Sequence, residues 1–219
     1  MTIRIRPYQR RRSRPMIVTV SALFVAATLT WSIVLISAAG RSGTSACPNP
    51  AAGGALGTVL DATALDEVAP LAPDAIKVRV LNGGGQRGQA NLVAAQLGDL
   101  GFTMAAPPDN DPHYPAGGLS CRGQLRFGPA GEGAAATLAI VLPCTELVRD
   151  DRSDETVDVA VGASFGDVNP SRPARDLLDQ LTSPASVGGT AVGSAAGDDD
   201  PTRPAVDPAT LASARAVPC

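Results

Sequence analysis

Three glycines at the spacing G-x-G-x-x-G are the first feature of this sequence that could serve chemistry. Gly83, Gly85 and Gly88 follow a run of alternating apolar and charged residues and precede an apolar stripe at helical spacing. Between a strand and a helix, such a motif can hold dinucleotide phosphates at the helix N-terminus. The alternative is structural, because glycines allow a tight turn. A nucleotide-binding first strand is normally apolar throughout. We therefore predict a structural turn of Asn82 and the three glycines, positive φ at Gly83 or Gly85, and no cofactor.

Few other residues could support catalysis or bind a metal. The single histidine, His113, lies in a proline-rich loop, and no serine lies in a nucleophile-elbow context. The acidic run 198–200 lacks the spacing of a calcium loop. A glycan hydrolase needs two carboxylates about 5–10 Å apart. Asp109, Asp111 and Glu132 are the candidates near ordered loops, and nothing in the sequence pairs them. We predict no catalytic residue and no metal site, with an envelope glycan hydrolase or transferase as the alternative.

The four cysteines, Cys47, Cys121, Cys144 and Cys219, all follow the apolar N-terminal segment. An even number in an oxidising compartment predicts two disulfides. Zinc is the rival interpretation, but no two cysteines have the two-to-four-residue spacing typical of its sites. We predict a Cys121–Cys144 bridge, between the second strand and the end of the following helix. Cys47 and Cys219 then form a clasp for the tail, unless Cys219 is free or pairs between chains.

The N-terminus predicts a membrane anchor. Residues 1–15 are basic, and residues 16–40 are uncharged and long enough to cross about 30 Å of hydrocarbon. The arginine excess before the apolar run places the N-terminus in the cytoplasm and the C-terminus outside. Two alternatives remain: a cleaved signal ending at 37–39, and a lipoprotein with Cys47 as the modified residue. The basic residues of the N-terminal segment are Arg4, Arg6, Arg10, Arg11, Arg12 and Arg14.

The remainder of the chain is acidic. No Asp or Glu precedes Asp61, so all 21 acidic residues follow the apolar run, whereas six of the 18 basic residues precede it. This charge balance argues against binding nucleic acid through bulk charge. Lys77 is the only lysine, and the composition is rich in alanine, glycine and proline. These features suggest a GC-rich genome such as that of an actinobacterium.

The periodicity predicts an α/β domain, a small two-layer β-α-β-α-β unit. Strands are expected at 76–81, 124–127 and 156–161, where apolar and polar residues alternate or short apolar runs end in glycine. Helices are expected at 90–100 and 132–142. Because Lys77, Arg79 and Asp158 place charges on one face of the strands, we expect both helices to cover the other face and the charged face to be wet.

The flanking segments are predicted to be simpler. Residues 41–74 are rich in alanine and glycine and form an expected stalk with at most a short helix at 58–68. Residues 167–219 are expected to hold a helix at 173–181 and a flexible tail. A second short helix could open at Asp207, because Pro208 suits the first helical position.

Parts of this domain resemble the LytR C-terminal domain, a module appended to LytR-type envelope proteins of Gram-positive bacteria and actinobacteria. The resemblance lies in the segment 78–83, Gly88, the amphipathic helix with its ending at 100–102, and the closing segment 157–165. It covers about residues 75–166. The phosphotransferase domain that LytR proteins carry has no room in this chain.

The resemblance implies a function without a reaction. A single-pass protein with this module and four cysteines is similar to actinobacterial proteins that keep the envelope intact. We therefore expect a non-enzymatic, membrane-anchored protein that binds a wall polymer or an envelope partner through its extracytoplasmic domain. The segment 121–123 and the cysteine at the end of the tail are not part of the family pattern.

Overall fold

The computed structural model describes residues 18–25, 27–28, 30–31, 46–51, 53–183 and 206–217. The described residues between 18 and 31 are helical and belong to a compact unit of their own, and residues from Gly43 onward form the second unit. Within the described ranges, no helix has the length and apolar character needed to span a bilayer. Much of the predicted anchor at 16–40 and all of segment 1–15 lie outside these ranges, so the anchor stays a prediction.

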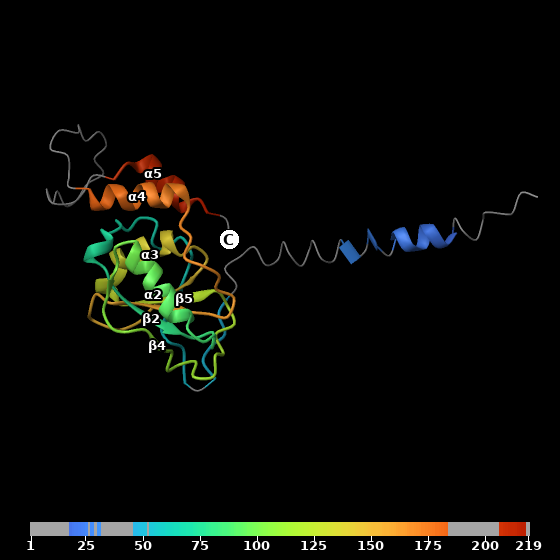
Figure 1. Cartoon of the computed structure of the whole chain (residues 1–219), viewed down its shortest axis with the longest axis horizontal. Helices are drawn as coiled ribbons and strands as arrows, with labels where there is room; N and C mark the ends of the chain where they lie inside the picture. The colour runs from blue at the N-terminus through green and yellow to red at the C-terminus, as the bar shows by residue number, and fades with distance from the viewer. Residues whose placement is uncertain are drawn as a thin grey trace, which may run out of the picture. The chain divides into compact units, whose positions relative to one another are not determined.

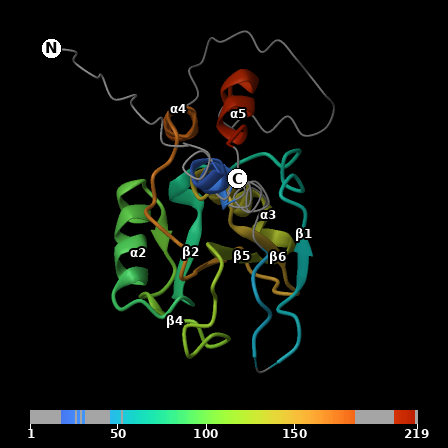
Figure 2. The same ribbon diagram turned by 90° about the vertical axis from the view of Figure 1, so that its right-hand side faces the viewer.

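The second unit is built on one mixed sheet with the strand order β1-β6-β5-β7-β2-β3, in which β4 also pairs with β2. Figure 2 shows β1 at one edge of this sheet. The pairs β2–β7, β2–β3, β2–β4 and β5–β6 are parallel, and the pairs β1–β6 and β5–β7 are antiparallel. The strands are β1 (Thr58–Leu60), β2 (Lys77–Asn82), β3 (Thr103–Met104), β4 (Asp109–Asn110), β5 (Gly123–Phe127), β6 (Glu146–Arg149) and β7 (Val157–Val161).

Two helices cover one face of the sheet, as the charge pattern predicted. Helix α2 (Gln89–Asp99) leads from β2 to β3, and α3 (Glu132–Val141) leads from β5 to β6. Each helix is therefore the crossover that joins two parallel strands, β2 to β3 and β5 to β6. Their buried side chains pack with the inward residues of the strands into one core. The predicted strands and helices of the β-α-β-α-β unit are all present.

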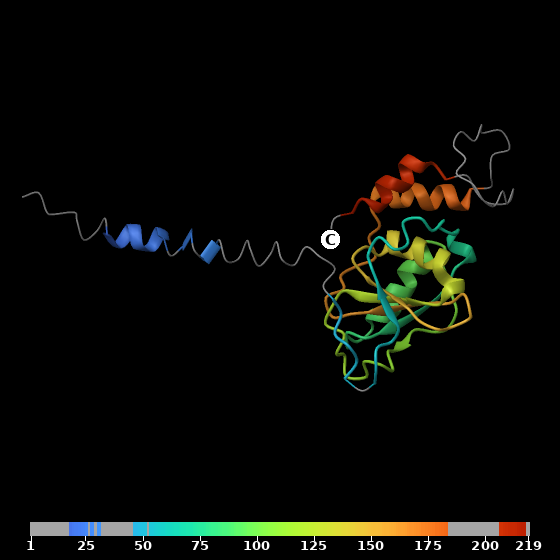
Figure 3. The same cartoon turned by 180° about the vertical axis from the view of Figure 1, so that it is seen from behind.

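A third layer lies on α3. Helix α4 (Arg172–Thr182) begins at the cap residue Ser171 and α5 (Pro208–Arg215) begins at the cap residue Asp207. The two helices lie against each other in Figures 1 and 3. Leu177 and Ala214 of this pair are buried with Ile140 of α3. Both helices agree with the predicted positions, so this part of residues 167–219 is ordered instead of a free tail.

The predicted stalk is wrong where the structure describes it. The expected helix at 58–68 is replaced at its start by β1, which pairs with β6. Leu65 is buried in the main core. Two short 3-10 helices also occur, η1 (Pro73–Ala75) and η2 (Pro129–Gly131). Strand β6 was not predicted from the sequence. Because β1 pairs with β6, the strand at 58–60 could not be predicted either.

The charged face of the sheet is wet only in part. The Lys77 and Arg79 side chains are 60% and 45% exposed, as expected, but the Asp158 and Arg126 side chains are only 3% exposed. Loop segments around residues 47–56 and 111–121 lie over this face, with Tyr114 and Leu119 packed in a second apolar cluster. Asp158 and Arg126 are therefore enclosed and need partners within the protein.

Candidate binding site at the end of strand β2

The turn after β2 is held by side-chain and backbone hydrogen bonds. The Asn82 Oδ1 atom accepts from the Gly85 backbone N–H at 3.0 Å, and its Nδ2 atom donates to the Gln86 carbonyl at 2.9 Å. Gly85 and Gly88 have φ values of 77° and 80°. The predicted positive φ is thus confirmed at Gly85. The motif forms a tight turn from β2 into α2, as the structural interpretation required.

The turn is also confined by close neighbours. The backbone N–H groups of Gly83 and Gly84 both donate to the Val161 carbonyl, at 2.9 and 2.8 Å. A Cβ atom at Gly84 would lie 2.5 Å from the Ala163 backbone nitrogen, and one at Gly83 would lie 2.8 Å from the Leu119 side chain. The turn therefore rests directly on the end of β7 and on the loop that covers the sheet.

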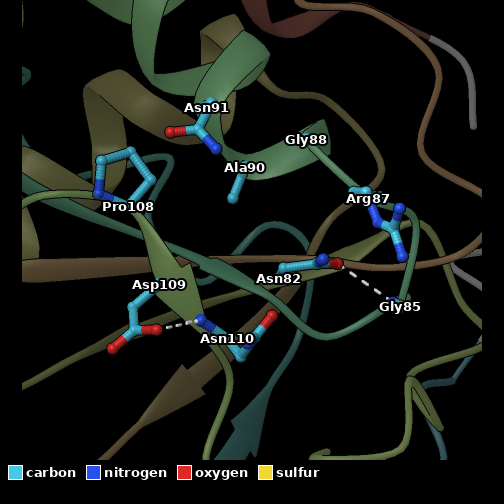
Figure 4. A pocket seen from close by; sticks show the side chains of 9 residues that line it. All are labelled: Asn82, Gly85, Arg87, Gly88, Ala90, Asn91, Pro108, Asp109 and Asn110. Atoms are coloured by element: carbon cyan, nitrogen blue, oxygen red, sulfur yellow. Dashed lines mark hydrogen bonds between the residues drawn. The ribbon is translucent and has the colours of Figure 1, made fainter.

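A pocket of about 360 Å³ opens beside this turn (Figure 4). It lies outside the carboxyl end of β2, between the start of α2 and the short strand β4. Ligands of open α/β sheets bind at this end of parallel strands. The parallel pairing of β2 and β4 sets Leu81 opposite Asp109 and Asn82 opposite Asn110. The described residues that line the pocket are Asn82, Gly85, Arg87, Gly88, Ala90, Asn91, Pro108, Asp109 and Asn110.

Several polar groups of the pocket are available to a ligand. Within the described part of the chain, the Arg87 guanidinium and the Asn91 and Asn110 amides have no partner in the protein, and all three residues are exposed. The Asp109 Oδ1 atom accepts from the Asn110 backbone N–H at 2.7 Å, which orients the carboxylate. The Asn82 amide already forms hydrogen bonds to Gly85 and Gln86 in the turn. The pocket thus offers donors, acceptors and one charge of each sign.

The three carboxylates considered for glycan hydrolysis do not form a pair. Asp109 is in the pocket, whereas Asp111 is completely buried and bound to Arg126. Glu132, at the start of α3, pairs with Arg149 at 2.8 Å. A hydrolytic site requires two carboxylates facing one bond. Asp109 is the only carboxylate among the described lining residues, so this pocket lacks the acid–base pair.

His113 and the acidic run 198–200 were the other residues considered for catalysis or metal binding. His113 is exposed in the loop over the sheet, and its backbone N–H donates to Asp111 Oδ1 at 3.0 Å. The acidic run 198–200 lies outside the described residues. Within the described ranges, no group of three or more His, Cys, Asp or Glu residues could hold a metal ion.

A buried polar network under the covering loop was not predicted. Arg126 donates to both Asp111 carboxylate oxygens and to Gln124 Oε1. Gln124 in turn donates to Glu146 Oε2 at 2.7 Å, and the Tyr114 ring lies against the Arg126 guanidinium at 5.6 Å. Burial raises the pKa of Tyr114, although the nearby Arg126 charge opposes that shift. The sequence offered one signal, the polar residues Gln124 and Arg126 on either side of Leu125 in the predicted strand, and the structure buries the whole strand.

A second network fixes the other half of the same face. Asp158 accepts from Arg79 at 2.6 Å and from Arg152 at 2.8 Å, and Arg152 also contacts Asp150. Burial by itself would raise the pKa of Asp158. The hydrogen bonds from Arg152 and Arg79 together outweigh burial and hold that pKa below its ordinary value. Asp158 is therefore a charged anchor between β7, β2 and the connection from β6.

The predicted pairing of Cys121 with Cys144 and of Cys47 with Cys219 is wrong. Cys47 is bonded to Cys121, 74 positions away, with a Cα–Cα distance of 5.0 Å. Cys121 faces the cluster under the covering loop, whereas α3, which leads to Cys144, packs on the opposite face. A Cys121–Cys144 bridge would have to join these two sides. Cys144 is also disulfide-bonded, and Cys219 lies outside the described residues.

The Cys47–Cys121 bond pins the chain before β1 to the sheet. The Cys47 backbone N–H donates to Glu146 Oε1 at 3.0 Å, and the Tyr114 hydroxyl donates to the Pro48 carbonyl at 2.5 Å. The segment that was expected to be a stalk is thus part of the cover over the buried network.

Comparison with known proteins agrees with this architecture. The Cell envelope integrity protein Cei of Mycobacterium tuberculosis is 41% identical over 165 residues, which cover 73% of this chain and 76% of that protein. The chain belongs to the Cei family. Residues 75–165 match the domain family described as LytR cell envelope-related transcriptional attenuator, LytR_C, as the resemblance implied.

A solved relative has the same fold. The crystal structure of the soluble domain of a conserved hypothetical secreted protein from Mycobacterium marinum matches with a TM-score of 0.60 and 37% identity, over 75% of this chain and 99% of that one. The match extends well beyond the 75–165 segment. The α/β fold is therefore shared with this solved relative.

Proposed function

We propose that this protein is a non-enzymatic, membrane-anchored component that supports the integrity of the cell envelope. Its domain from residue 46 onward binds a wall polymer or an envelope partner, and residues 16–40 anchor it with the N-terminus in the cytoplasm. Family membership supports the envelope role. The basic segment before the apolar run supports the orientation.

One observation carries the binding part of the proposal. The pocket beside the β2–α2 turn presents Arg87, Asn91 and Asn110 side chains that have no partner in the described protein. Their backbone is held by the Asn82 hydrogen bonds and by pairing of β4 with β2. Because the backbone beneath these unpaired groups is fixed, only their side chains have to be ordered when a ligand binds.

The rival function, an envelope glycan hydrolase or transferase, has less support. Its carboxylates would have to converge, but Asp111 and Glu132 are each paired with an arginine away from the pocket. Asp109 alone could accept a proton, without a second group across a substrate bond. Binding without turnover therefore fits the arrangement better.

The test is retention of wall material by the protein. Full-length protein in detergent micelles is incubated with fractionated wall polymers of a Mycobacterium species and with detergent-solubilised envelope proteins, and retained material is identified by mass spectrometry. We expect a saturable wall or envelope ligand that is recovered chemically unchanged. Recovery of shortened glycan products would favour the enzyme, and failure to retain either class of material would overturn the proposal.

A further inference from the structure

We propose that the pocket beside the β2–α2 turn binds a neutral, polyhydroxylated ligand, a segment of a glycan chain. Arg87, Asn91, Asp109 and Asn110 supply the polar contacts. This inference rests on the proposed binding function and gives it a ligand class and a location.

The charges of the pocket favour a neutral ligand. The Arg87 guanidinium and the Asp109 carboxylate are the charged groups among its described lining residues. Asp109 repels an anion such as phosphate, and Arg87 repels a cation. A ligand without net charge meets neither penalty and can hydrogen-bond to both groups.

The donors and acceptors fit hydroxyl groups. Guanidinium groups only donate, a carboxylate only accepts, and the free amides of Asn91 and Asn110 do both. A hydroxyl also donates and accepts. Neighbouring sugar hydroxyls can therefore satisfy this mixed set, whereas a phosphate, which mainly accepts, leaves Asp109 and the amide oxygens without donors.

An apolar surface adjoins the polar groups. Pro108 and Ala90 line the pocket itself (Figure 4). Together they offer contact for the C–H faces of a sugar ring.

The size and openness suit part of a chain. A volume of about 360 Å³ lies at the lower end of the range of small-molecule sites. Most of its polar lining residues are exposed at the surface. A polymer can therefore place one segment in the pocket and continue past it, without a chain end having to enter.

The experiment measures binding of defined probes to the full-length protein in detergent micelles. The probes are neutral oligosaccharides released from mycobacterial wall by mild acid and freed of charged species, and inorganic phosphate as the anionic comparison. We expect saturable binding of the neutral oligosaccharides that changes little between about 50 and 500 mM salt, because screening weakens only charge-dependent contacts. Phosphate should not compete.

Matched variants locate the site. Asn91→Ala and Asp109→Asn should each weaken oligosaccharide binding by about tenfold, the effect of one lost hydrogen bond to a buried ligand group. Arg87→Gln should weaken it by a similar factor. The controls are Asp99→Asn at the far end of α2 and Arg172→Gln on α4, both exposed and without a described partner. They should bind like the natural chain, and melting temperatures of all variants should agree.

The outcomes separate this inference from the proposed function. Glycan binding that is unaffected by the pocket variants overturns the location but leaves wall binding standing. Salt-sensitive binding of phosphate alone, lost in Arg87→Gln, overturns the ligand class. Retention of an envelope protein without any neutral oligosaccharide also overturns the ligand class. Retention of no wall or envelope material at all removes the proposed function itself.

Discussion

Arg126 and Asp111 form a two-pronged ion pair in the interior of the domain, with Nη2–Oδ2 and Nη1–Oδ1 distances of 2.6 and 3.2 Å. Their side chains are 3% and 0% exposed. Asp111 follows β4, close to the pocket, and Arg126 lies in β5. The pair therefore fastens the loop over the sheet, and removing either charge leaves the other buried without its partner.

Loss of the Asp111 charge should be strongly destabilising. We expect Asp111→Asn to lower the free energy of unfolding by about 3 kcal/mol, within the range for breaking a buried pair. Asp151 is exposed in the connection between β6 and β7, so the matched substitution Asp151→Asn should change that free energy by less than about 0.5 kcal/mol. Urea denaturation measures both. Equal effects of the two substitutions would show that the pair contributes nothing particular.

The glycine turn has its own stability signature. Gly85 has a φ of 77°, and an added Cβ would lie 3.0 Å from the Gly117 Cα. We expect Gly85→Val to destabilise the domain by about 1–2 kcal/mol, because a β-branched residue is strained at positive φ.

Gly98→Ala is the control for this substitution. Gly98 lies in α2 with nothing within 4 Å of an added Cβ. It should be neutral or stabilising by up to about 1 kcal/mol, because alanine is the better helix former. A thermal melt that shows no loss for Gly85→Val would contradict the proposed reason for the motif.

Asp158 should contribute stability that depends on pH. Its pKa is below the ordinary value when folded, so the contribution is complete above the unfolded value of about 3.9. It is lost as the pH falls through the lowered folded pKa. At neutral pH, Asp158→Asn should cost about 2 kcal/mol, the scale of a hydrogen bond to a charged group.

Unfolding free energies measured from neutral pH down to about pH 2 provide the check, since the contribution of Asp158 begins to fall once the pH drops below its unfolded pKa. The gap between the natural chain and Asp158→Asn should close on the acid side. Asp167→Asn, at an exposed position without a described partner, should run parallel to the natural chain. A gap that stays constant through the acid range would mean that the charge of Asp158 is not what stabilises the sheet.

The disulfides can be read directly. Non-reducing peptide mapping should find Cys47 linked to Cys121, and Cys144 linked to Cys219, the one cysteine that then remains. Removing the first bond with Cys47→Ala and Cys121→Ala should cost about 4.5 kcal/mol in the chain-entropy treatment of a loop with a separation of 74. Recovery of a 121–144 peptide would contradict the structure, and a reduction-sensitive dimer would place Cys219 between chains.

Membrane topology is testable by fusion. A reporter that works only outside the membrane should be active when joined after Cys219 and inactive when joined after Arg14, because the arginines retain that end in the cytoplasm. Sequencing of the mature N-terminus is the companion measurement. A protein that begins near Gly40 would replace the anchor with a cleaved signal.

Local patterns in the sequence were enough for much of the architecture. The alternation in β2 and β7, the helical stripe of α2 and the start of α5 at Asp207 and Pro208 act over a few neighbouring positions. The glycine turn was predictable for the same reason, since positive φ is a property of single residues. The motif was interpreted as a turn only, so the pocket beside it and its lining from β4 were not predicted.

Only the tertiary structure shows which segments that are distant in the chain contact one another. Strand β1 is too short to be recognised before its pairing with β6 is known. The Cys47–Cys121 bond depends on which face of the sheet each cysteine meets, and sequence distance favoured the wrong pair. Asp158 was expected on a wet face, but the fold encloses it with Arg152. Such contacts depend on how distant segments pack in the folded chain, and local residue propensities do not predict that packing.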